Sequence, residues 1–120
     1  METIKNARLL RIFVGEVDKI GNQPLYEAIV FKAKAAGLAG ATGFKGILSY
    51  GTKSRVNTAK IFEISPDLPV VIEIIDTEEK IKAFIPALNA LFERADSGGL
   101  VTIERAEIIL YRSTKILENN

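Results

Sequence analysis

The residues best suited to chemistry lie in one segment, residues 37–60, with the sequence GLAGATGFKGILSYGTKSRVNTAK. This segment holds five glycines and four cations but no Asp or Glu, although the whole chain has a formal net charge of only +1. Glycine lets backbone N–H groups approach a ligand closely, and cations offset the charge of an anion. The segment therefore predicts an anion-binding loop. The alternative for Lys53 and Arg55 is a solvated loop whose charges serve solubility.

Two residue types that carry much of enzyme chemistry are missing, because the sequence contains no histidine and no cysteine. The chain therefore lacks the usual general base, the Ser-His-Asp triad, disulfide bonds and most ligands for zinc, copper or haem. Carboxylate pairs for acid–base catalysis could come from two places, Glu16 with Asp18 and Asp76 with Glu78. Loop charge and helix capping explain these acids more simply. We expect a protein that is not an enzyme, requires no cofactor and has no metal site.

Length and composition indicate a single folded unit. With 120 residues, 48% of them hydrophobic, the chain is expected to form one domain over residues 1–120, with a core at about 7–112 and a C-terminal tail at 113–120. Its apolar runs are shorter than the roughly 18 residues that a membrane span takes, and residues 1–10 lack the features of a signal peptide. The nearly neutral charge argues against a nucleic-acid partner. We expect a soluble, cytoplasmic protein.

The elements that must position the loop follow the order strand, helix, strand, strand, helix, strand. Strands are predicted at residues 7–15, 41–50, 61–65 continuing at 70–76, and 100–112, helices at 24–37 and between Asp76 and Asp96, and polar connections at 16–23 and 52–58. The two prolines within residues 65–69 predict a turn there.

The second helix has the clearest pattern, an apolar stripe formed by Ile81, Phe84, Ile85 and Leu88. Asp76 is its expected N-cap, with Glu79 three residues later, close to the capping-box pattern. Pro86 removes a backbone hydrogen bond within the helix. We therefore expect a kink or a short break near residues 82–86.

This order of elements predicts an α+β fold, the ferredoxin-like βαββαβ sandwich, in which both helices cover one face of an antiparallel sheet. The other face of the sheet should then be open, yet the predicted strands carry Leu, Ile, Phe and Val on both sides. Because a large exposed apolar surface usually binds a partner, we expect copies of the chain to associate through this face.

Three stretches also carry a resemblance to a known family: PLYEAIVFKAKAAGLAGAT at residues 24–42, DLPVVIEIIDTEEKI at 67–81 and GLVTIERAEIILY at 99–111. Over residues 7–112 the chain resembles the PII-like uncharacterised family known as domain of unknown function 190. The resemblance implies a homotrimer whose sheets face inward. It also implies that a small anionic effector, such as AMP, ADP, ATP or a cyclic dinucleotide, binds in clefts between subunits. The trimer would then signal to a partner such as a membrane transporter or channel.

The resemblance further implies which residues form the effector site. They lie at the base of a long loop after the second strand, in a short loop before the last strand, and on the last strand itself. In this chain they are Ser49, Tyr50, Gly51, Thr52, Lys53, Ser54, Arg55, Asn57, Ser97, Gly98, Gly99 and Arg112. Relatives commonly carry His at the position of Asn57, so any role of that His is lost or altered here.

Simpler roles are available for several of these residues. Gly98 and Gly99 could form only a helix stop and a turn, rather than a backbone cradle for phosphate. Tyr50 could pack at the end of its strand instead of stacking on adenine. Arg112 could pair with a surface carboxylate instead of reaching the cleft.

Two other functions fit the predicted fold. A metal-handling protein of the CutA type has a related fold and would bind no nucleotide. A ferredoxin-like RNA-binding module would carry aromatic residues on an open strand, whereas here Lys45-Gly46 is followed by Ile47-Leu48. The near-neutral charge makes this second alternative the weaker one.

Overall fold

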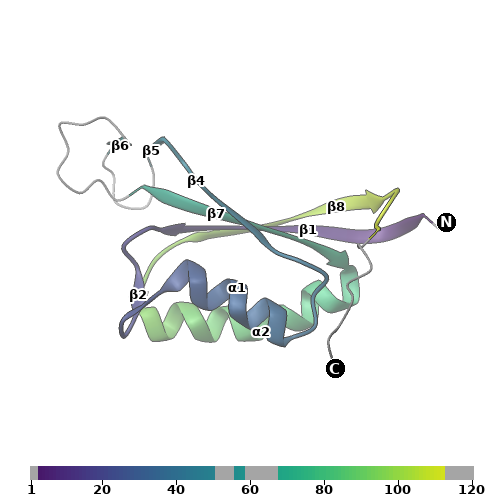
Figure 1. Ribbon diagram of the computed structural model, residues 1–120, viewed down its shortest axis with the longest axis horizontal. Coiled ribbons are helices and arrows are strands. Elements are labelled where there is room, and N and C mark those ends of the chain that lie inside the picture. The colour runs from purple at the N-terminus through teal and green to yellow at the C-terminus, as the bar shows by residue number, and fades with distance from the viewer. Residues whose placement is uncertain (1–2, 51–55, 59–67, 113–120) are drawn as a thin grey trace, which may run out of the picture.

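The computed structural model describes residues 3–50, 56–58 and 68–112, with the backbone alone at 49–50 and 56–58. Its main sheet has four antiparallel strands in the order β4-β7-β1-β8 (Figure 1). These strands are β1 (Ile4–Gly15), β4 (Thr42–Lys45), β7 (Pro69–Thr77) and β8 (Leu100–Ile108). Helices α1 (Leu25–Ala35) and α2 (Glu78–Ala95) both cover one face of the sheet. The predicted ferredoxin-like fold with an antiparallel sheet is confirmed.

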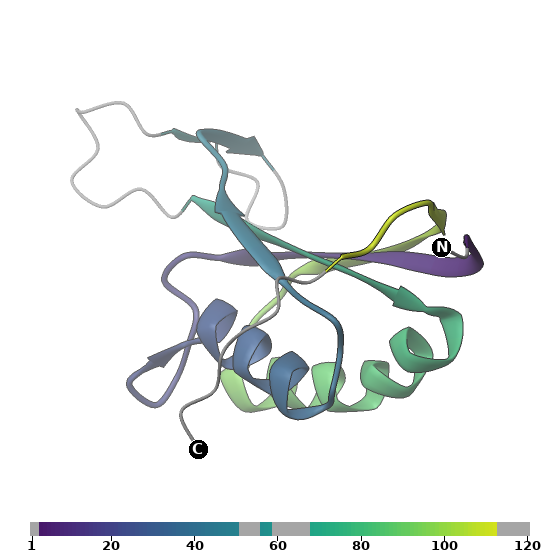
Figure 2. The same ribbon diagram turned by 45° about the vertical axis from the view of Figure 1, so that its right-hand side comes forward.

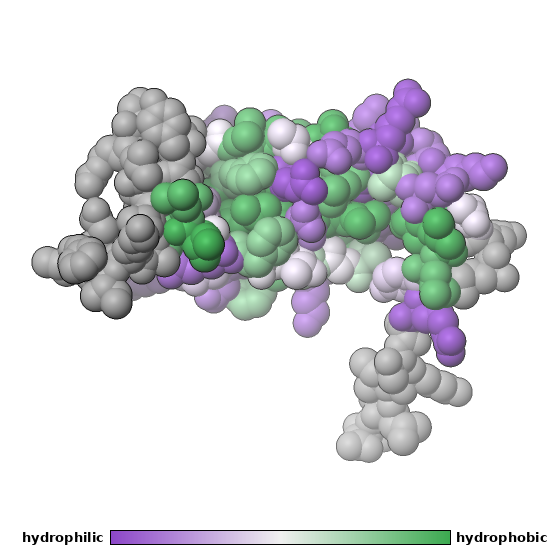
Figure 3. Space-filling model, turned by 90° about the horizontal axis from the view of Figure 1, so that it is seen from above, coloured by the Kyte–Doolittle hydropathy of each residue, from purple (hydrophilic) through white to green (hydrophobic). Residues whose placement is uncertain are grey.

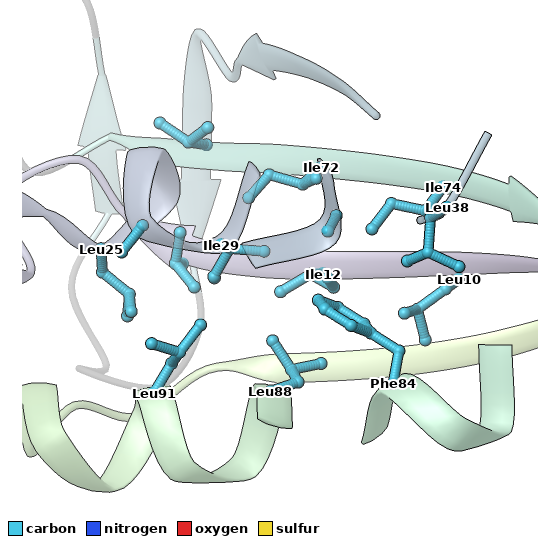
Figure 4. Packing of buried hydrophobic residues seen from close by; sticks show 14 of the residues in the cluster. Leu10, Ile12, Leu25, Ile29, Leu38, Ile72, Ile74, Phe84, Leu88 and Leu91 are labelled. Carbon is cyan, nitrogen blue, oxygen red and sulfur yellow. The ribbon is translucent and has the colours of Figure 1, made fainter. Parts of the chain in front are cut away.

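The hydrophobic core lies between the sheet and the two helices (Figure 4). Successive side chains of a strand point to opposite faces, so every second residue of β1 and β7 meets the helices. The core residues include Leu10, Ile12, Val14, Val70, Ile72 and Ile74 from the sheet, Leu25 and Ile29 from α1, and Ile81, Phe84, Leu88 and Leu91 from α2. Fully burying one such side chain stabilises the fold by about 1.5–3 kcal/mol. The packed core therefore stabilises the strand ends from which the loops begin.

Helix α2 begins differently from the sequence prediction. Its N-cap is Thr77, whose hydroxyl oxygen accepts a hydrogen bond from the Lys80 N–H at 3.4 Å, so the prediction that Asp76 caps the helix was wrong. The buried carboxylate of Asp76 instead accepts hydrogen bonds from the backbone N–H groups of Ala39 at 2.9 Å and Thr77 at 2.7 Å. Asp76 thus joins the loop after α1 to the start of α2.

Helix α2 runs without a break from Glu78 to Ala95, although Pro86 lies inside it. Of the kink or short break expected near residues 82–86, the break was therefore a wrong prediction. Pro86 and Lys82 both lie on the exposed side of the helix, where water can hydrate the Lys82 carbonyl that loses its intrahelical partner.

Other elements differ in extent from the prediction. The segment expected as a polar loop at 16–23 contains a small hairpin, β2 (Lys19–Ile20) with β3 (Gln23–Pro24). The strand expected at 41–50 is divided into β4 and β5 (Leu48–Tyr50), and β6 (Val56–Thr58) lies within the expected polar connection. β8 ends at Ile108, earlier than the predicted end at residue 112. The strand predicted at 61–65 lies outside the described residues.

Neither α1 nor α2, the two α-helices of the described ranges, combines the length and the apolar character that a membrane span requires.

Candidate functional site

The predicted anion loop is flanked by a hairpin that extends beyond one end of the sheet (Figure 1). β5 pairs with β6 in antiparallel fashion, and Ser49 lies opposite Asn57. The pairing places Tyr50 opposite Val56, so the two ends of the intervening segment are adjacent. The predicted site residues Gly51, Thr52, Lys53, Ser54 and Arg55 lie outside the described residues. The described backbone therefore brings three of the predicted site residues together: Ser49, Tyr50 and Asn57.

A clamp of three contacts holds the base of this hairpin on the sheet. The Gly46 N–H donates to the Pro69 carbonyl at 2.8 Å, and the Glu16 N–H donates to the Leu68 carbonyl at 2.8 Å. The Lys45 ammonium pairs with the Glu16 carboxylate at 2.7 Å. A Cβ on Gly46 would lie 2.7 Å from Pro69 Cγ, so glycine permits this close approach. These contacts hold the residue that follows β4 next to the first residue of β7, so the chain leaves and rejoins the sheet at the same place.

The second predicted wall, Ser97 to Gly99, connects α2 to β8. Helix α2 ends at Ala95, and its C-cap Asp96 has a left-handed conformation with φ 49°, so neither glycine provides the helix stop. A Cβ on Gly99 would lie 2.7 Å from the Phe13 carbonyl oxygen and 2.6 Å from the Phe92 ring, which explains this glycine by packing. The Ser97 hydroxyl oxygen is buried without a hydrogen-bond partner in the described part of the chain. Such a group commonly marks a missing partner.

The two walls lie at the same end of the sheet but at opposite edges. β4 is one edge strand and β8 the other, with β7 and β1 between them. Lys45 at the end of β4 pairs with Val70, and Leu100 at the start of β8 pairs with Phe13, which places both at one end. Neighbouring strands are about 4.8 Å apart, so the sheet separates the walls by roughly 14 Å. A single chain does not bring the two walls together.

Arg112 lies apart from both walls. β8 ends at Ile108, at the other end of the sheet, and residues 109–112 then run back toward the loop before β4 (Figure 2). The neighbouring Tyr111 hydroxyl donates to the Ala39 carbonyl at 3.3 Å, which places this segment beside residues 39–42. Arg112 is exposed and is not part of a strand, so the prediction that the last strand carries it was wrong.

Residues 109–111 form one wall of a groove that is not among the predicted sites. The groove has a volume of about 830 Å³ and lies between this segment, residues 39–42, the last residues of β8 (106–108) and the side of β7 that faces away from the helices. Ile75, Ala106, Ile108 and Leu110 provide much of its apolar lining. The apolar run that continues past the end of β8 was the one signal that could have indicated it.

The open face of the sheet carries an apolar row across all four strands. Directly opposed residues show that Phe44, Val71, Phe13 and Leu100 form this row. Figure 3, which views this face, shows hydrophobic side chains over much of it, with hydrophilic ones between and beside them. Phe44 and Leu100, at the two ends of the row, are exposed. The expectation of an open face with apolar groups is confirmed.

An ion-pair cluster lies beside the apolar row. Arg11 donates to Glu73 at 2.8 Å and to Glu104 at 2.9 Å, which links β1 to both of its neighbours. The hydrogen bond to Glu73 is the main cause that raises the pKa of Arg11, and the charge of Glu104 adds to it. The guanidinium therefore stays charged at every pH at which the protein is handled.

The acids considered for catalysis all have structural partners. Asp18 accepts a hydrogen bond from the Gly15 N–H at 2.8 Å, and Glu78 pairs with Arg8. Glu16 belongs to the hairpin clamp, and Asp76 binds two backbone N–H groups. Within the described ranges, no three or more acidic side chains are grouped so that they could hold a metal ion.

Comparisons with known proteins bear on this geometry. The family model DUF190, described as an uncharacterized ACR, matches residues 7–108. A UPF0166 protein of Aquifex aeolicus (strain VF5) is 39% identical over 109 residues, which cover 91% of this chain and 98% of that protein. A UPF0166 protein of Methanocaldococcus jannaschii is 38% identical over 97 residues, covering 81% of this chain and 86% of the relative.

Solved structures with the same fold include two groups of proteins. A nitrogen regulatory PII-like protein from Thiomonas intermedia K12, bound to ADP, AMP and bicarbonate, matches with a TM-score of 0.64 and 16% identity over 85% of this chain and 87% of the other. CutA from Synechococcus elongatus PCC7942 matches with a TM-score of 0.58 and 15% identity over 88% and 82%. At these identities the likeness shows the fold, which is PII-like.

Proposed function

This chain belongs to the DUF190 family, and from that membership and its PII-like fold we propose that it is a regulatory protein that binds an adenine nucleotide or a similar small anion. In this proposal the protein is a homotrimer, the effector lies in clefts between subunits, and the liganded trimer modulates a partner such as a membrane transporter or channel. In this proposal the protein meets its partner in the cytoplasm.

The observation that carries the proposal is the position of the two predicted walls. The β5–β6 hairpin and residues 97–99 lie at one end of the sheet but at its opposite edges, so a site that contains both needs two chains. The apolar row on the open face, which is exposed at its ends Phe44 and Leu100, supplies a surface through which copies can pack. Packing of two sheets edge to edge or face to face would bring the hairpin of one copy toward residues 97–99 of the next.

Both walls offer groups that suit an anion. Lys53 and Arg55 are cations in a stretch without acids, and they lie in the sequence between the described strands β5 and β6. On the other wall, the buried Ser97 hydroxyl lacks a partner among the described residues and is a free donor for a phosphate oxygen. The related-fold protein from Thiomonas intermedia is bound to ADP, AMP and bicarbonate, which supports the choice of an adenine nucleotide as effector.

The clamp at the base of the hairpin indicates how binding could be reported. Because the Lys45–Glu16 pair and the Gly46–Pro69 hydrogen bond fix the base, a ligand changes the hairpin beyond it and leaves the sheet in place. Residues 52–58 would be the reporting segment that a partner reads.

Isothermal titration calorimetry with ATP, ADP, AMP and a cyclic dinucleotide tests the proposal. The double variant Lys53→Ala, Arg55→Ala should weaken nucleotide affinity at least about tenfold, since it removes two charge-assisted contacts. The matched control is Lys32→Ala, Lys34→Ala, which makes the same change of net charge at two exposed positions of α1.

Light scattering on each variant checks that assembly is intact. Equal affinity of both double variants would remove Lys53 and Arg55 from the site. If divalent cations bind and none of the nucleotides gives a binding signal, the metal-handling alternative is favoured over this proposal.

A further inference from the structure

Strand β8 is exposed on both of its faces and along its outer edge, the edge that points away from β1. None of its nine residues, all of which the structure describes, is buried. Val101 and Ile103 lie on the face that points toward the helices, because they pair with the core residues Ile12 and Leu10. They are nevertheless 40% and 45% exposed. The apolar row lies on the opposite face, so contacts made by that row alone leave Val101 and Ile103 uncovered. A long apolar edge strand of this kind is a template for pairing with another strand.

The chain carries a second edge that is free among the described strands, the edge of β4. All four residues of β4 are exposed, and β4 pairs with β7 alone. Because β1 is antiparallel to both β7 and β8, and β4 is antiparallel to β7, strands β4 and β8 run in opposite directions. A second copy that is rotated about an axis along the strands keeps its open face and its strand ends in the same sense. Its β4 would therefore meet β8 in antiparallel fashion, as every pair of the main sheet does.

We propose that β4 of a second copy adds to the outer edge of β8, with Phe44 of the second copy opposite Leu100. This register joins the two exposed ends of the apolar row, so that the row continues from one copy into the next. It also places residues 41–45 of the second copy beside residues 99–103, which include Val101 and Ile103. Each copy offers the same two different edges, so the contact is heterologous and can close into the proposed trimer.

This pairing completes the effector site, and it rests on the proposed function for the kind of ligand. Within one chain, three strand spacings, or roughly 14 Å, separate the two walls, whereas one spacing of about 5 Å separates them across the new pair. The chain passes from β4 almost directly into β5, so the hairpin of the second copy comes beside residues 97–99 of the first. The buried Ser97 hydroxyl, which has no partner among the described residues, then lies at the contact between two chains.

Pairing of β8 with β8 of a second copy is the alternative use of this edge. Such a twofold contact would leave both β4 edges free and both Phe44 side chains exposed at the ends of their rows. It would also place residues 97–99 of the two copies at opposite ends of the joined sheet. Neither hairpin would then meet residues 97–99 of the other copy, so the site would stay incomplete.

Cysteine cross-linking tests the pairing on the full chain, which has no cysteine of its own. Thr42 and Thr102 lie at the two ends of one row of paired residues that runs through Glu73 and Arg11. Roughly 14 Å therefore separates them in one chain, which is too far for a disulfide bond. In the proposed register, Thr42 of the second copy lies opposite Thr102 at about 5 Å. The double variant Thr42→Cys, Thr102→Cys should therefore form covalent dimers and trimers under mild oxidation, as a non-reducing gel shows.

The single variants distinguish this contact from a twofold one. Each should stay monomeric on the gel, because a contact between two different edges needs both cysteines. Cross-linking of Thr102→Cys alone would show that β8 pairs with itself, and cross-linking of Thr42→Cys alone would show a twofold contact at the other edge. Either result overturns the proposal. The matched control Thr42→Cys, Glu107→Cys should not cross-link, since Glu107 lies five residues farther along β8 and on its other face.

This test is read separately from nucleotide binding. A double variant that is trimeric by light scattering but forms no cross-link overturns the pairing, and so does a wild-type protein that is monomeric. Calorimetric titration of the wild-type protein with ADP tests the proposed function alone. Cross-links without ADP binding would keep the pairing and contradict the proposed function, whereas ADP binding by a trimer that does not cross-link would do the reverse.

Discussion

The Asp76 carboxylate accepts a hydrogen bond from the Ala39 N–H at 2.9 Å, which ties the loop after α1 to the strand that leads into α2. The two residues are far apart in the sequence, and Asp76 is only 7% exposed. A buried carboxylate is tolerated because backbone N–H groups satisfy it. This single contact supports one wall of the groove and fixes the connection from the first helix to the edge strand β4.

Removal of the Asp76 carboxylate should therefore destabilise the protein. Asp76→Ala leaves the N–H groups of Ala39 and Thr77 without their acceptor, so we expect the free energy of unfolding to fall by about 2–4 kcal/mol. Urea denaturation followed by circular dichroism measures the change. The control is Glu79→Ala in the exposed first turn of α2, where a loss below about 1 kcal/mol is expected. A loss for Asp76→Ala no larger than that of the control would show that the contact contributes little.

Gly99 offers a second test, because the structure gives it a packing role and the family resemblance gives it a ligand role. A Cβ at this position would lie 2.7 Å from the Phe13 carbonyl oxygen, which belongs to the backbone and cannot move aside cheaply. Gly99→Ala should lower the free energy of unfolding by about 1–3 kcal/mol. Gly40→Ala is the control, since nothing lies within 4 Å of a Cβ there, and its effect should stay within about 1 kcal/mol.

Thermal and urea unfolding of both glycine variants, each with and without ADP, distinguishes the two roles. A stable Gly99→Ala variant that fails to bind ADP would contradict the packing role and favour a direct ligand contact.

The fold could be predicted from the sequence because its signals are local. The apolar stripe of α2 and the alternation in β1 each follow from the geometry of one element, and Gly37 at φ 80° ends α1 as its position predicts. The role of Asp76 could not be predicted in this way. An Asp before a helix is typical of an N-cap, and nothing local shows that Ala39 lies close enough to compete for it.

The candidate site was harder to predict for a different reason. Sequence order does not show that Ser49 follows one edge strand of the main sheet, β4, whereas Ser97 precedes the other, β8, because strand order depends on long-range pairing. The groove depends in the same way on residues from three distant segments, among them Ala39, Ile75 and Tyr111. Local patterns therefore identify the elements, whereas the sites arise from pairings that only the folded chain, or several chains, provide.

The apolar row on the open face makes a last prediction, which concerns assembly. Phe44 is 47% exposed at one end of this row, and Phe31 is 57% exposed on α1, on the other side of the sheet. If copies of the chain pack through the row, Phe44→Asp places a charge in the contact and should shift the protein from trimer toward monomer, because an unpaired buried charge is costly. Phe31→Asp makes the same chemical change at a comparable exposure and should leave the trimer intact. Size-exclusion chromatography with light scattering measures both masses. A wild-type protein that is monomeric at high concentration would refute association through this row, and loss of the trimer in Phe31→Asp alone would place the contact on the helical side instead.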